Sequence, residues 1–352
     1  MKINQNKDIF YTKLAFQQAE INLGSTKGNP SVGCIVVKNN SVISLGRTSF
    51  NGRPHAEANA LKRKKDYSNS DLYVTLEPCS HYGKTPPCIN KIVKKKIKKV
   101  LYPILDVDSR SQNKAQKKLK SKKILVKKFI LRKLAKKFYQ SYFLQSSNQI
   151  PLVDAKIAIS KDYFTINKKN KWITNKKSRE LGNFLRSKYD CLLTTSKTIN
   201  NDNPLLDCRI AGVEKKSPNL IILDRYFKLK KKINILKNRQ RKIYIFTTVN
   251  NISKEIYFKK KGVKIIKFSK DINKNLFLKK MFFVIKKLGL NRVFVESGIS
   301  FLSQLLKDNL VKNLYLFKSS KKLLSHGVNN SSPFEIRKIK IFKKNKIQVN
   351  LY

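Results

Sequence analysis

A histidine, a glutamate and two cysteines in the first hundred residues have the types and the order that zinc chemistry requires. His55 and Glu57 are separated by one residue, and Cys79 and Cys88 follow with eight residues between them. A catalytic zinc takes three N or S ligands and keeps its fourth position for water, and His55, Cys79 and Cys88 supply such a set. The metal lowers the pKa of the bound water toward ~7. Glu57 is then placed to move a proton from this water to a leaving amine.

Each of these residues has an ordinary explanation when it is taken alone. A histidine before a helix is usually a cap or a surface residue, and a pair of cysteines usually lies in a core. The combination of His-x-Glu, Pro-Cys and a second Cys, in this order, is the signature of zinc-dependent nucleobase deaminases. In deaminases of the tRNA and cytidine types two residues separate the cysteines, so the eight found here indicate another type.

The segments around these residues resemble one family, the bifunctional riboflavin-biosynthesis deaminase/reductases. Residues 78–88 match the family pattern P-C-S-H-x-G-x-T-P-P-C without a gap, residues 29–33 match N-P-x-V-G, and residues 54–57 match P-H-A-E. The resemblance implies deamination of a diaminopyrimidinone that carries a ribosylamino 5′-phosphate.

The same resemblance assigns further substrate residues in this half. Asn29 is expected to bind the pyrimidine, and His81 and Lys84 are expected to contact the base and the phosphate. Residues 106–109 read Asp-Val-Asp-Ser where the family tends toward D-P-N-P. This departure bears on substrate affinity and leaves the zinc chemistry untouched.

The resemblance continues in the second half, where the family carries a reductase domain related to dihydrofolate reductase. The matching segments are residues 156–162, 172–174, 185–186, 198–209 and 295–298. Reduction of a ribosylamine to a ribitylamine is a hydride transfer, so a nicotinamide brings the reactivity. Arginine suits the substrate phosphate because its guanidinium group binds two oxygens.

Two sets of binding residues follow from this resemblance. Those expected at the substrate are Asn170, Arg186, Leu206, Arg209 and Glu296. Those expected at NADPH are Ala158, Trp172, Thr198, Asp202 and the segment from Gly298. A turn before a helix at Gly298 would present free backbone N–H groups to a phosphate.

Several positions depart from the family pattern. They are Asn203 for the second Asp of D-D-P, Tyr163 for glycine, Arg225 for a small residue, Lys312-Asn313 for Asp-Glu, and Ser320 for proline. Tyr163 would cost ~1 kcal/mol or more if its turn needs φ > 0. These departures keep a second hypothesis open, a single-function deaminase whose eroded reductase domain survives as a structural or dimerising unit.

The net charge of the 352-residue chain is unusually high. It carries 78 Lys or Arg against 21 Asp or Glu, a formal net charge of +57. Such an excess is typical of phosphate-backbone binding, so an RNA-acting deaminase and a nucleic-acid-binding protein without catalysis stay open. Only 13 of the basic residues are Arg and 65 are Lys, a bias typical of an AT-rich genome. We therefore expect no specific nucleic acid, and RNA binding that is non-specific and lost as salt rises.

Hydrophobic periodicity predicts two α/β domains that would position these residues. Residues 143–151 are the most linker-like stretch, and the boundary is placed there. With the resemblance, residues 1–147 are expected to form a cytidine-deaminase-like three-layer α/β/α domain, the zinc-dependent deaminase. Residues 148–352 are expected to form a dihydrofolate-reductase-like α/β domain, the NADPH-dependent reductase.

The expected elements follow from the apolar spacing and the turn residues. In the first domain we expect helices at 8–23, 55–65 and 87–96, an amphipathic helix within 114–137, and strands at 32–37, 42–45, 71–76 and 99–102. In the second we expect strands at 154–159, 191–194, 220–223, 243–246, 263–266 and 293–296, and helices at 175–188, 272–287 and 300–307.

Cofactors, partners and location complete these expectations. We expect one Zn²⁺ per chain, NADPH, a small phosphorylated pyrimidine substrate, and a homodimer or higher homo-oligomer. Five Cys in a chain of this length do not fit a secreted disulfide scaffold. No stretch reaches the ~20 apolar residues of a membrane span, and the first residues lack a signal-peptide h-region. The protein is therefore expected in the cytoplasm, without a membrane partner.

Overall fold

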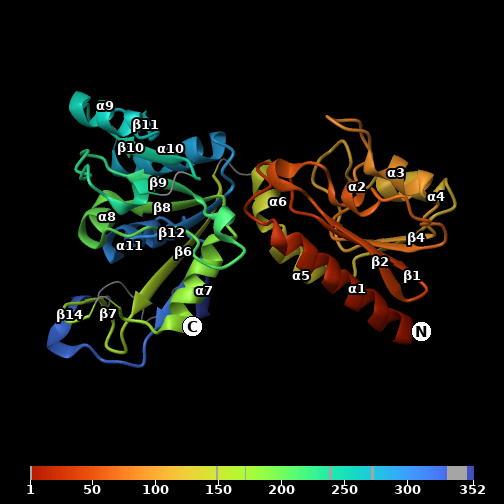
Figure 1. Cartoon of the computed structure of the whole chain (residues 1–352), viewed down its shortest axis with the longest axis horizontal. Coiled ribbons are helices and arrows are strands. Elements are labelled where there is room, and N and C mark those ends of the chain that lie inside the picture. The colour runs from red at the N-terminus through yellow and green to blue at the C-terminus, as the bar shows by residue number, and fades with distance from the viewer. Residues whose placement is uncertain (1, 148–149, 171, 238–239, 271–272, 331–346) are drawn as a thin grey trace. The chain divides into compact units, whose positions relative to one another are not determined.

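The computed structural model of the chain describes residues 2–147, 150–170, 172–237, 240–270, 273–330 and 347–352. Its internal contacts divide the chain into two compact units, Met1–Asn148 and Gln149–Tyr352 (Figure 1). Each unit has hydrophobic clusters of its own. No helix in the described part of the chain is long and apolar enough to cross a membrane.

The first unit contains a five-stranded mixed sheet of order β2-β1-β3-β4-β5. Its strands are β1 (Gly33–Lys38), β2 (Ser41–Arg47), β3 (Asp71–Val74), β4 (Lys99–Tyr102) and β5 (Leu125–Lys128). β1 and β2 form the expected antiparallel hairpin, and β1 also pairs antiparallel with β3. β3, β4 and β5 are parallel to one another.

Helices cover both faces of this sheet. They are α1 (Lys2–Ile21), α2 (Ala56–Ala60), α3 (Cys88–Lys94), α4 (Ala115–Lys120), α5 (Arg132–Phe138) and α6 (Gln140–Ser147). Tyr11 and Ala15 of α1 belong to the apolar cluster on one face. Ala56, Ile92 and Leu119, from α2, α3 and α4, belong to the cluster on the other face. The predicted three-layer α/β/α fold is confirmed.

The second unit is built on an eight-stranded sheet of order β11-β10-β9-β8-β12-β6-β13-β15, in which all neighbouring strands are parallel. Its strands are β6 (Leu152–Ile159), β8 (Cys191–Thr195), β9 (Asn219–Leu223), β10 (Ile243–Thr247), β11 (Lys264–Lys267), β12 (Arg292–Glu296), β13 (Asn313–Lys318) and β15 (Gln348–Leu351). A separate antiparallel pair consists of β7 (Phe164–Asn167) and β14 (Gly327–Asn330).

Helices also cover both faces of the second sheet (Figure 1). They are α7 (Lys176–Arg186), α8 (Ser196–Asp202), α9 (Ile252–Lys260), α10 (Lys274–Lys287) and α11 (Ile299–Lys307). Short 3₁₀ turns lie at Phe50–Gly52 in the first unit and at Glu214–Lys216, Asn234–Lys237 and Leu324–His326 in the second. Phe282 of α10 and Leu302 of α11 pack on one face. Ile199 of α8 and Phe258 of α9 pack on the other.

Some predicted elements differ from the structure. The prediction of a single helix within 114–137 is wrong, because α4, β5 and α5 lie there. The side chains of β5 are all exposed or partly exposed, so its sequence lacks the buried apolar residues that indicate a strand. The linker-like residues 143–147 belong to α6. The helix expected at 55–65 ends at Ala60, and the first residue of the one expected at 272–287 lies outside the described residues.

Many turns place a side chain in the left-handed backbone region. Sixteen described residues other than glycine have positive φ, against five glycines. Tyr163 has φ 71°, so the strain expected where the family has glycine is present. Asn203 ends α8 with φ 40°, a conformation that asparagine tolerates.

Asp190 is a buried carboxylate that connects the starts of two neighbouring strands. Asp190 lies just before β8, and Arg292 is the first residue of β12. The Oδ2 atom of Asp190 accepts hydrogen bonds from the backbone N–H groups of Asn291 at 2.7 Å and Arg292 at 2.8 Å. Burial raises the pKa of Asp190 from 3.8 to about 6, although these N–H groups and Arg292 partly offset the effect.

This carboxylate predicts a pH-dependent stability. Because the folded-state pKa lies above the unfolded value, the folded chain loses stability as pH rises from 4 through 6, by about 3 kcal/mol at pH 7. Asp190→Asn, which cannot ionise, should therefore be more stable than the parent at pH 7, and the gap should close toward pH 4. Urea unfolding at both pH values measures this, with exposed Glu214→Gln as the control. Equal stabilities at pH 7 would contradict the prediction.

Candidate active sites

The three predicted zinc ligands sit at the starts of two short helices and in the loop after β3. His55 precedes α2 in extended backbone, with φ −68° and ψ 162°. Cys88 is the first residue of α3, which Pro87 precedes. Proline suits the residue before a helix because it has no N–H to satisfy there. Cys79 follows β3 and Pro78.

The ligand atoms of these three residues lie within 4.8 Å of one another. His55 Nδ1 is 3.7 Å from Cys79 Sγ and 3.5 Å from Cys88 Sγ. Tetrahedral zinc with bonds of about 2.0 Å to nitrogen and 2.3 Å to sulfur separates such atoms by roughly 3.5 Å. One imidazole and two thiols at these distances therefore fit zinc in both chemistry and spacing.

Glu57 lies beside the cluster on the second residue of α2 and is only 4% exposed. Burial raises its pKa to about 7, and the neighbouring Cys79 thiolate adds to the effect. A carboxyl group with a pKa near neutrality can both take and deliver a proton. This is the property that the predicted proton shuttle needs.

The other predicted residues of the first unit lie in two loops. Asn29 precedes β1, and a Cβ on Gly52 would lie 2.2 Å from its Nδ2 atom. Gly52, with φ +91°, is therefore needed to place Asn29, and the Asn51-Gly52 pair is a turn signal in the sequence. In the loop between the cysteines, His81 Nδ1 lies 2.7 Å from Ser111 Oγ, whereas Lys84 is exposed.

In the second unit, Arg186 and Glu296 form a bidentate ion pair. The Nε–Oε1 and Nη2–Oε2 distances are 2.5 and 2.9 Å, and both side chains are 12% exposed. Burial alone would raise the pKa of Glu296, but Arg186 and Lys156 hold it below its usual value. Arg186 also donates to the carbonyl of Asp207 at 2.9 Å. The structure thus brings two predicted substrate residues into direct contact.

Two more predicted residues, Leu206 and Arg209, lie in the loop that contacts Arg186 through Asp207. Leu206 is buried with φ 53°, and Arg241 donates to its carbonyl and to that of Leu205. Arg209 is exposed and forms a 3.2 Å ion pair with Asp207. Sequence reasoning missed Arg241, because no local pattern links residue 241 to a loop 35 residues earlier.

The residues expected at NADPH gather in part at the carboxyl ends of neighbouring strands. Ala158 lies near the end of β6, Thr198 in the first turn of α8 after β8, and Gly298 at the start of α11 after β12. β8, β12 and β6 are adjacent, and ligands bind at such strand ends. No side chain caps α11 at Gly298, and the space beside this residue is open, so a phosphate could approach the start of the helix.

Three predicted residues lie on the solvent-exposed surface of this unit. Asp202 is the last residue of α8. Trp172 is 54% exposed, with the guanidinium of Arg179 4.7 Å from its ring centre. The backbone N–H of Asn170 donates to Asn167 Oδ1 within its own turn. Their part in binding stays a prediction.

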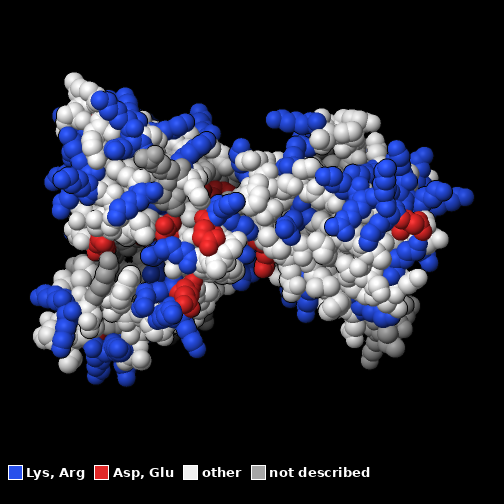
Figure 2. Space-filling view, viewed as in Figure 1, with Lys and Arg blue, Asp and Glu red and all other residues white. Residues whose placement is uncertain are grey.

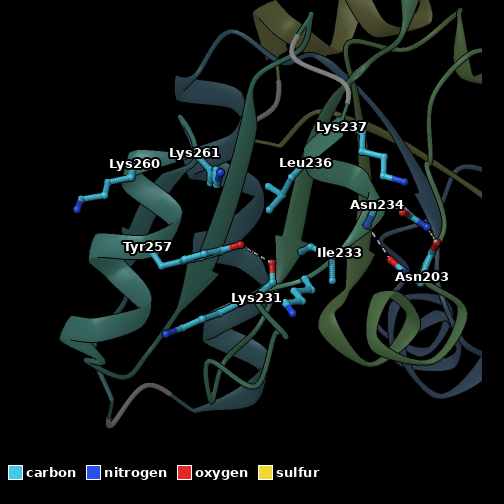
Figure 3. Close-up of a pocket in the computed structure, with 10 residues that line it drawn as sticks. Asn203, Lys231, Ile233, Asn234, Leu236, Lys237, Tyr257, Lys260 and Lys261 are labelled. Atoms are coloured by element: carbon cyan, nitrogen blue, oxygen red, sulfur yellow. Dashed lines mark hydrogen bonds between the residues drawn. The ribbon is translucent and has the colours of Figure 1, made fainter.

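A basic cavity of about 820 Å³ also lies in the second unit (Figure 3). The residues that line it are Asn203, Lys231, Lys232, Ile233, Asn234, Leu236, Lys237, Tyr257, Lys260 and Lys261. None of them is a predicted site residue, and none is acidic. Figure 2 shows Lys and Arg over the visible surface of both units, so a lysine-lined hollow is expected from composition alone.

Comparison with known families defines the class of both units. Residues 5–104 match the model of the cytidine and deoxycytidylate deaminase zinc-binding region. Residues 151–323 match the model of the RibD C-terminal domain. The chain therefore joins a zinc-dependent deaminase unit to a reductase unit.

Complete relatives share this arrangement. The chain is 34% identical over 337 residues to riboflavin biosynthesis protein RibD of Buchnera aphidicola subsp. Baizongia pistaciae, covering 90% of this chain and 87% of the relative. It is 31% identical to RibD of Aquifex aeolicus, over 91% and 88% of the two chains. The chain belongs to the RibD family of riboflavin biosynthesis proteins. It is a bifunctional deaminase and reductase that uses Zn²⁺ and NADPH, and neither the RNA-directed nor the single-function hypothesis is favoured.

Solved structures give the same result for the fold. A deaminase/reductase of Thermotoga maritima, whose activities are named for diaminohydroxyphosphoribosylaminopyrimidine and 5-amino-6-(5-phosphoribosylamino)uracil, matches with a TM-score of 0.81 and 27% identity, over 94% of this chain and 91% of that one. RibD of Acinetobacter baumannii matches with a TM-score of 0.77 and 28% identity, over 92% and 90%.

The cluster predicts one zinc per chain that depends on its cysteines. Cys88→Ser should lose nearly all bound zinc, because a hydroxyl is a poor zinc ligand at neutral pH. Cys34→Ala, which removes a buried cysteine of β1 outside the cluster, should keep one zinc per chain. Elemental analysis of the purified variants measures both. Full zinc content in Cys88→Ser would rule out this ligand set.

Proposed function

We propose that the two units act in sequence on one small phosphorylated pyrimidine. Residues 1–147 deaminate the diaminopyrimidinone that carries a ribosylamino 5′-phosphate, and residues 148–352 reduce the ribosyl group of the product to ribityl. The observation that carries this proposal is the cluster of His55, Cys79 and Cys88 with Glu57 beside it. The substrates named for the Thermotoga maritima enzyme support it.

In the deaminase unit, each residue has one task. His55, Cys79 and Cys88 hold zinc, which supplies an activated water when it is bound. Glu57 would take a proton from the attacking water and deliver a proton to the amine that leaves. Its burial supports this role, because the neutral and charged forms then have similar free energies near pH 7.

The loops beside the zinc site orient the substrate. Asn29 holds the pyrimidine, while His81 and Lys84 contact its base and phosphate. The exposure of Lys84 supports a contact with the charged end of the substrate, where a mobile cation needs no burial.

In the reductase unit, the sugar phosphate is bound by Arg186, Leu206, Arg209, Glu296 and Asn170. The pairing of Arg186 with Glu296 holds both side chains in place before substrate arrives, and Arg209 offers an exposed guanidinium to the phosphate.

NADPH supplies the hydride when it is bound, and a second set of residues holds it. They are Ala158, Trp172, Thr198, Asp202 and the segment from Gly298. The open start of α11 at Gly298 supports a phosphate contact there.

We propose further that the enzyme works in the cytoplasm as a homodimer or higher homo-oligomer. The zinc thiols and the buried free cysteines suit a reducing compartment. β15 lies at one end of the strand order among the described residues, with Leu351 60% exposed. An edge strand of this kind offers backbone groups to a second copy.

Glu57→Gln tests the deaminase step. The amide keeps the size of the side chain and cannot shuttle a proton, so ammonia release from the diaminopyrimidinone should fall by roughly 10²–10⁴-fold. Zinc content should stay at one per chain, and exposed Glu20→Gln on α1 serves as the control. Undiminished ammonia release with zinc bound would end the assignment.

Arg209→Ala tests the reductase step. Loss of a charged hydrogen bond to phosphate should raise the KM for the deaminated product by roughly 10–100-fold with little change in kcat. NADPH oxidation at 340 nm measures this, and exposed Lys215→Ala serves as the control. A flat trace from the parent enzyme with active deamination would instead support the eroded-reductase hypothesis.

A further inference from the structure

Ser111 lies in the loop between β4 and α4, where nothing so far assigns a functional residue. Its side chain is fully buried. Its Oγ atom accepts the backbone N–H of Ser80 at 3.0 Å and lies 2.7 Å from His81 Nδ1. One hydroxyl thus touches two consecutive residues of the loop that follows the zinc ligand Cys79.

The direction of the second hydrogen bond follows from proton counting. A backbone N–H can only donate, so Ser111 Oγ is the acceptor toward Ser80. Among the described residues, His81 Nδ1 is the acceptor within reach of the hydroxyl proton. If Ser111 did not donate there, a buried O–H would lack a hydrogen-bond partner, which is unfavourable. Ser111 therefore donates, and His81 Nδ1 accepts.

The charged groups near this contact have hydrogen-bond partners of their own. Asp108, on the same loop as Ser111, is bound by the guanidinium of Arg110 through both carboxylate oxygens. Lys118 donates to the carbonyl of Ser80 at 2.6 Å, which fixes the same stretch from the side of α4. The imidazole of His81 is thus held on its Nδ1 side by a neutral hydroxyl.

We propose that Ser111 is a positioning residue that fixes His81 as the Nε2–H tautomer, so that His81 presents a hydrogen-bond donor to the substrate. The proposal rests on the deaminase function above. It adds that His81 is the donor in its hydrogen bond with the substrate. The group recognised is an oxygen acceptor, either the ring carbonyl of the pyrimidinone or a phosphate oxygen. A ring nitrogen that itself carries hydrogen would be rejected, because the two donors would oppose each other.

The first test reads the tautomer directly. The chain has three histidines, so ¹⁵N–¹H correlation spectra of the histidine-labelled, zinc-loaded enzyme contain three rings. We expect the His81 ring, assigned by its absence in His81→Gln, to show protonated Nε2 and unprotonated Nδ1. Ser111→Ala should shift it toward a mixture of tautomers, and Ser109→Ala, an exposed serine of the same loop, should not. A protonated Nδ1 in the parent enzyme overturns the proposal.

The second test reads substrate binding. Ser111→Ala should raise the KM for deamination by about tenfold and leave kcat nearly unchanged, because the contact is made in both ground and transition states. Ser111→Thr, which keeps the hydroxyl, should restore the tautomer and most of the KM. Zinc content must stay at one per chain in all variants. An unchanged KM, or a fall in kcat alone, contradicts the positioning role.

The dephosphorylated substrate distinguishes the two acceptors. If the Ser111→Ala effect on KM persists with this nucleoside, the donor meets the ring carbonyl; if it disappears, the donor meets the phosphate. The outcome is separable from the deaminase assignment. If Glu57→Gln abolishes ammonia release while Ser111→Ala changes neither tautomer nor KM, only the present proposal fails.

Discussion

The hydrogen bond from the Cys88 N–H to the Cys79 sulfur, 3.2 Å long, is the contact on which the geometry of the zinc site depends. It forms only if α3 begins at Cys88 and the loop after β3 turns back toward it. His55, at the start of α2, must then approach both sulfurs. The sheet and its two short helices are therefore arranged so that three chain segments meet at one point. A metal bound there would fasten segments that are otherwise joined by apolar contacts and a few hydrogen bonds.

Carboxylates hold the loops around both sites, although acids are few in this chain. Glu77 accepts the backbone N–H groups of Asp106, Asn113 and Ala115 at 2.9–3.1 Å, which fixes the loop that contains Ser111. Asp224 does the same for the N–H groups of residues 228 and 229 after β9. A lysine cannot replace such a residue, because it has no acceptor. Lysine can therefore replace many surface residues of this chain, but it cannot replace Glu77 or Asp224.

The zinc site was predictable from sequence because its chemistry is carried by residue types at short spacing. The ligands, Glu57 and the start of α2 follow from local order alone. The β1–β2 hairpin and most buried strands follow from apolar runs. β5 could not be predicted in this way, because an edge strand with exposed lysines does not alternate apolar and polar residues. The positions of Ser111 and Arg241 depend on contacts with loops distant in sequence, for which a single chain gives no signal.

The left-handed turns described above bear on how the enzyme tolerates heat. Asparagine occupies seven of the sixteen non-glycine positions with positive φ, and the other nine are lysine, leucine, phenylalanine and tyrosine. Each of those nine carries a strain of about 1–2 kcal/mol. Five of them lie in the first unit and four in the second, so the strain in each unit is comparable with the whole stability of an ordinary domain, about 5–15 kcal/mol. Well-packed cores must offset that strain before they contribute any net stability. Each of these turns therefore lowers the temperature at which the folded chain unfolds, in a chain that has few glycines to relieve the strain.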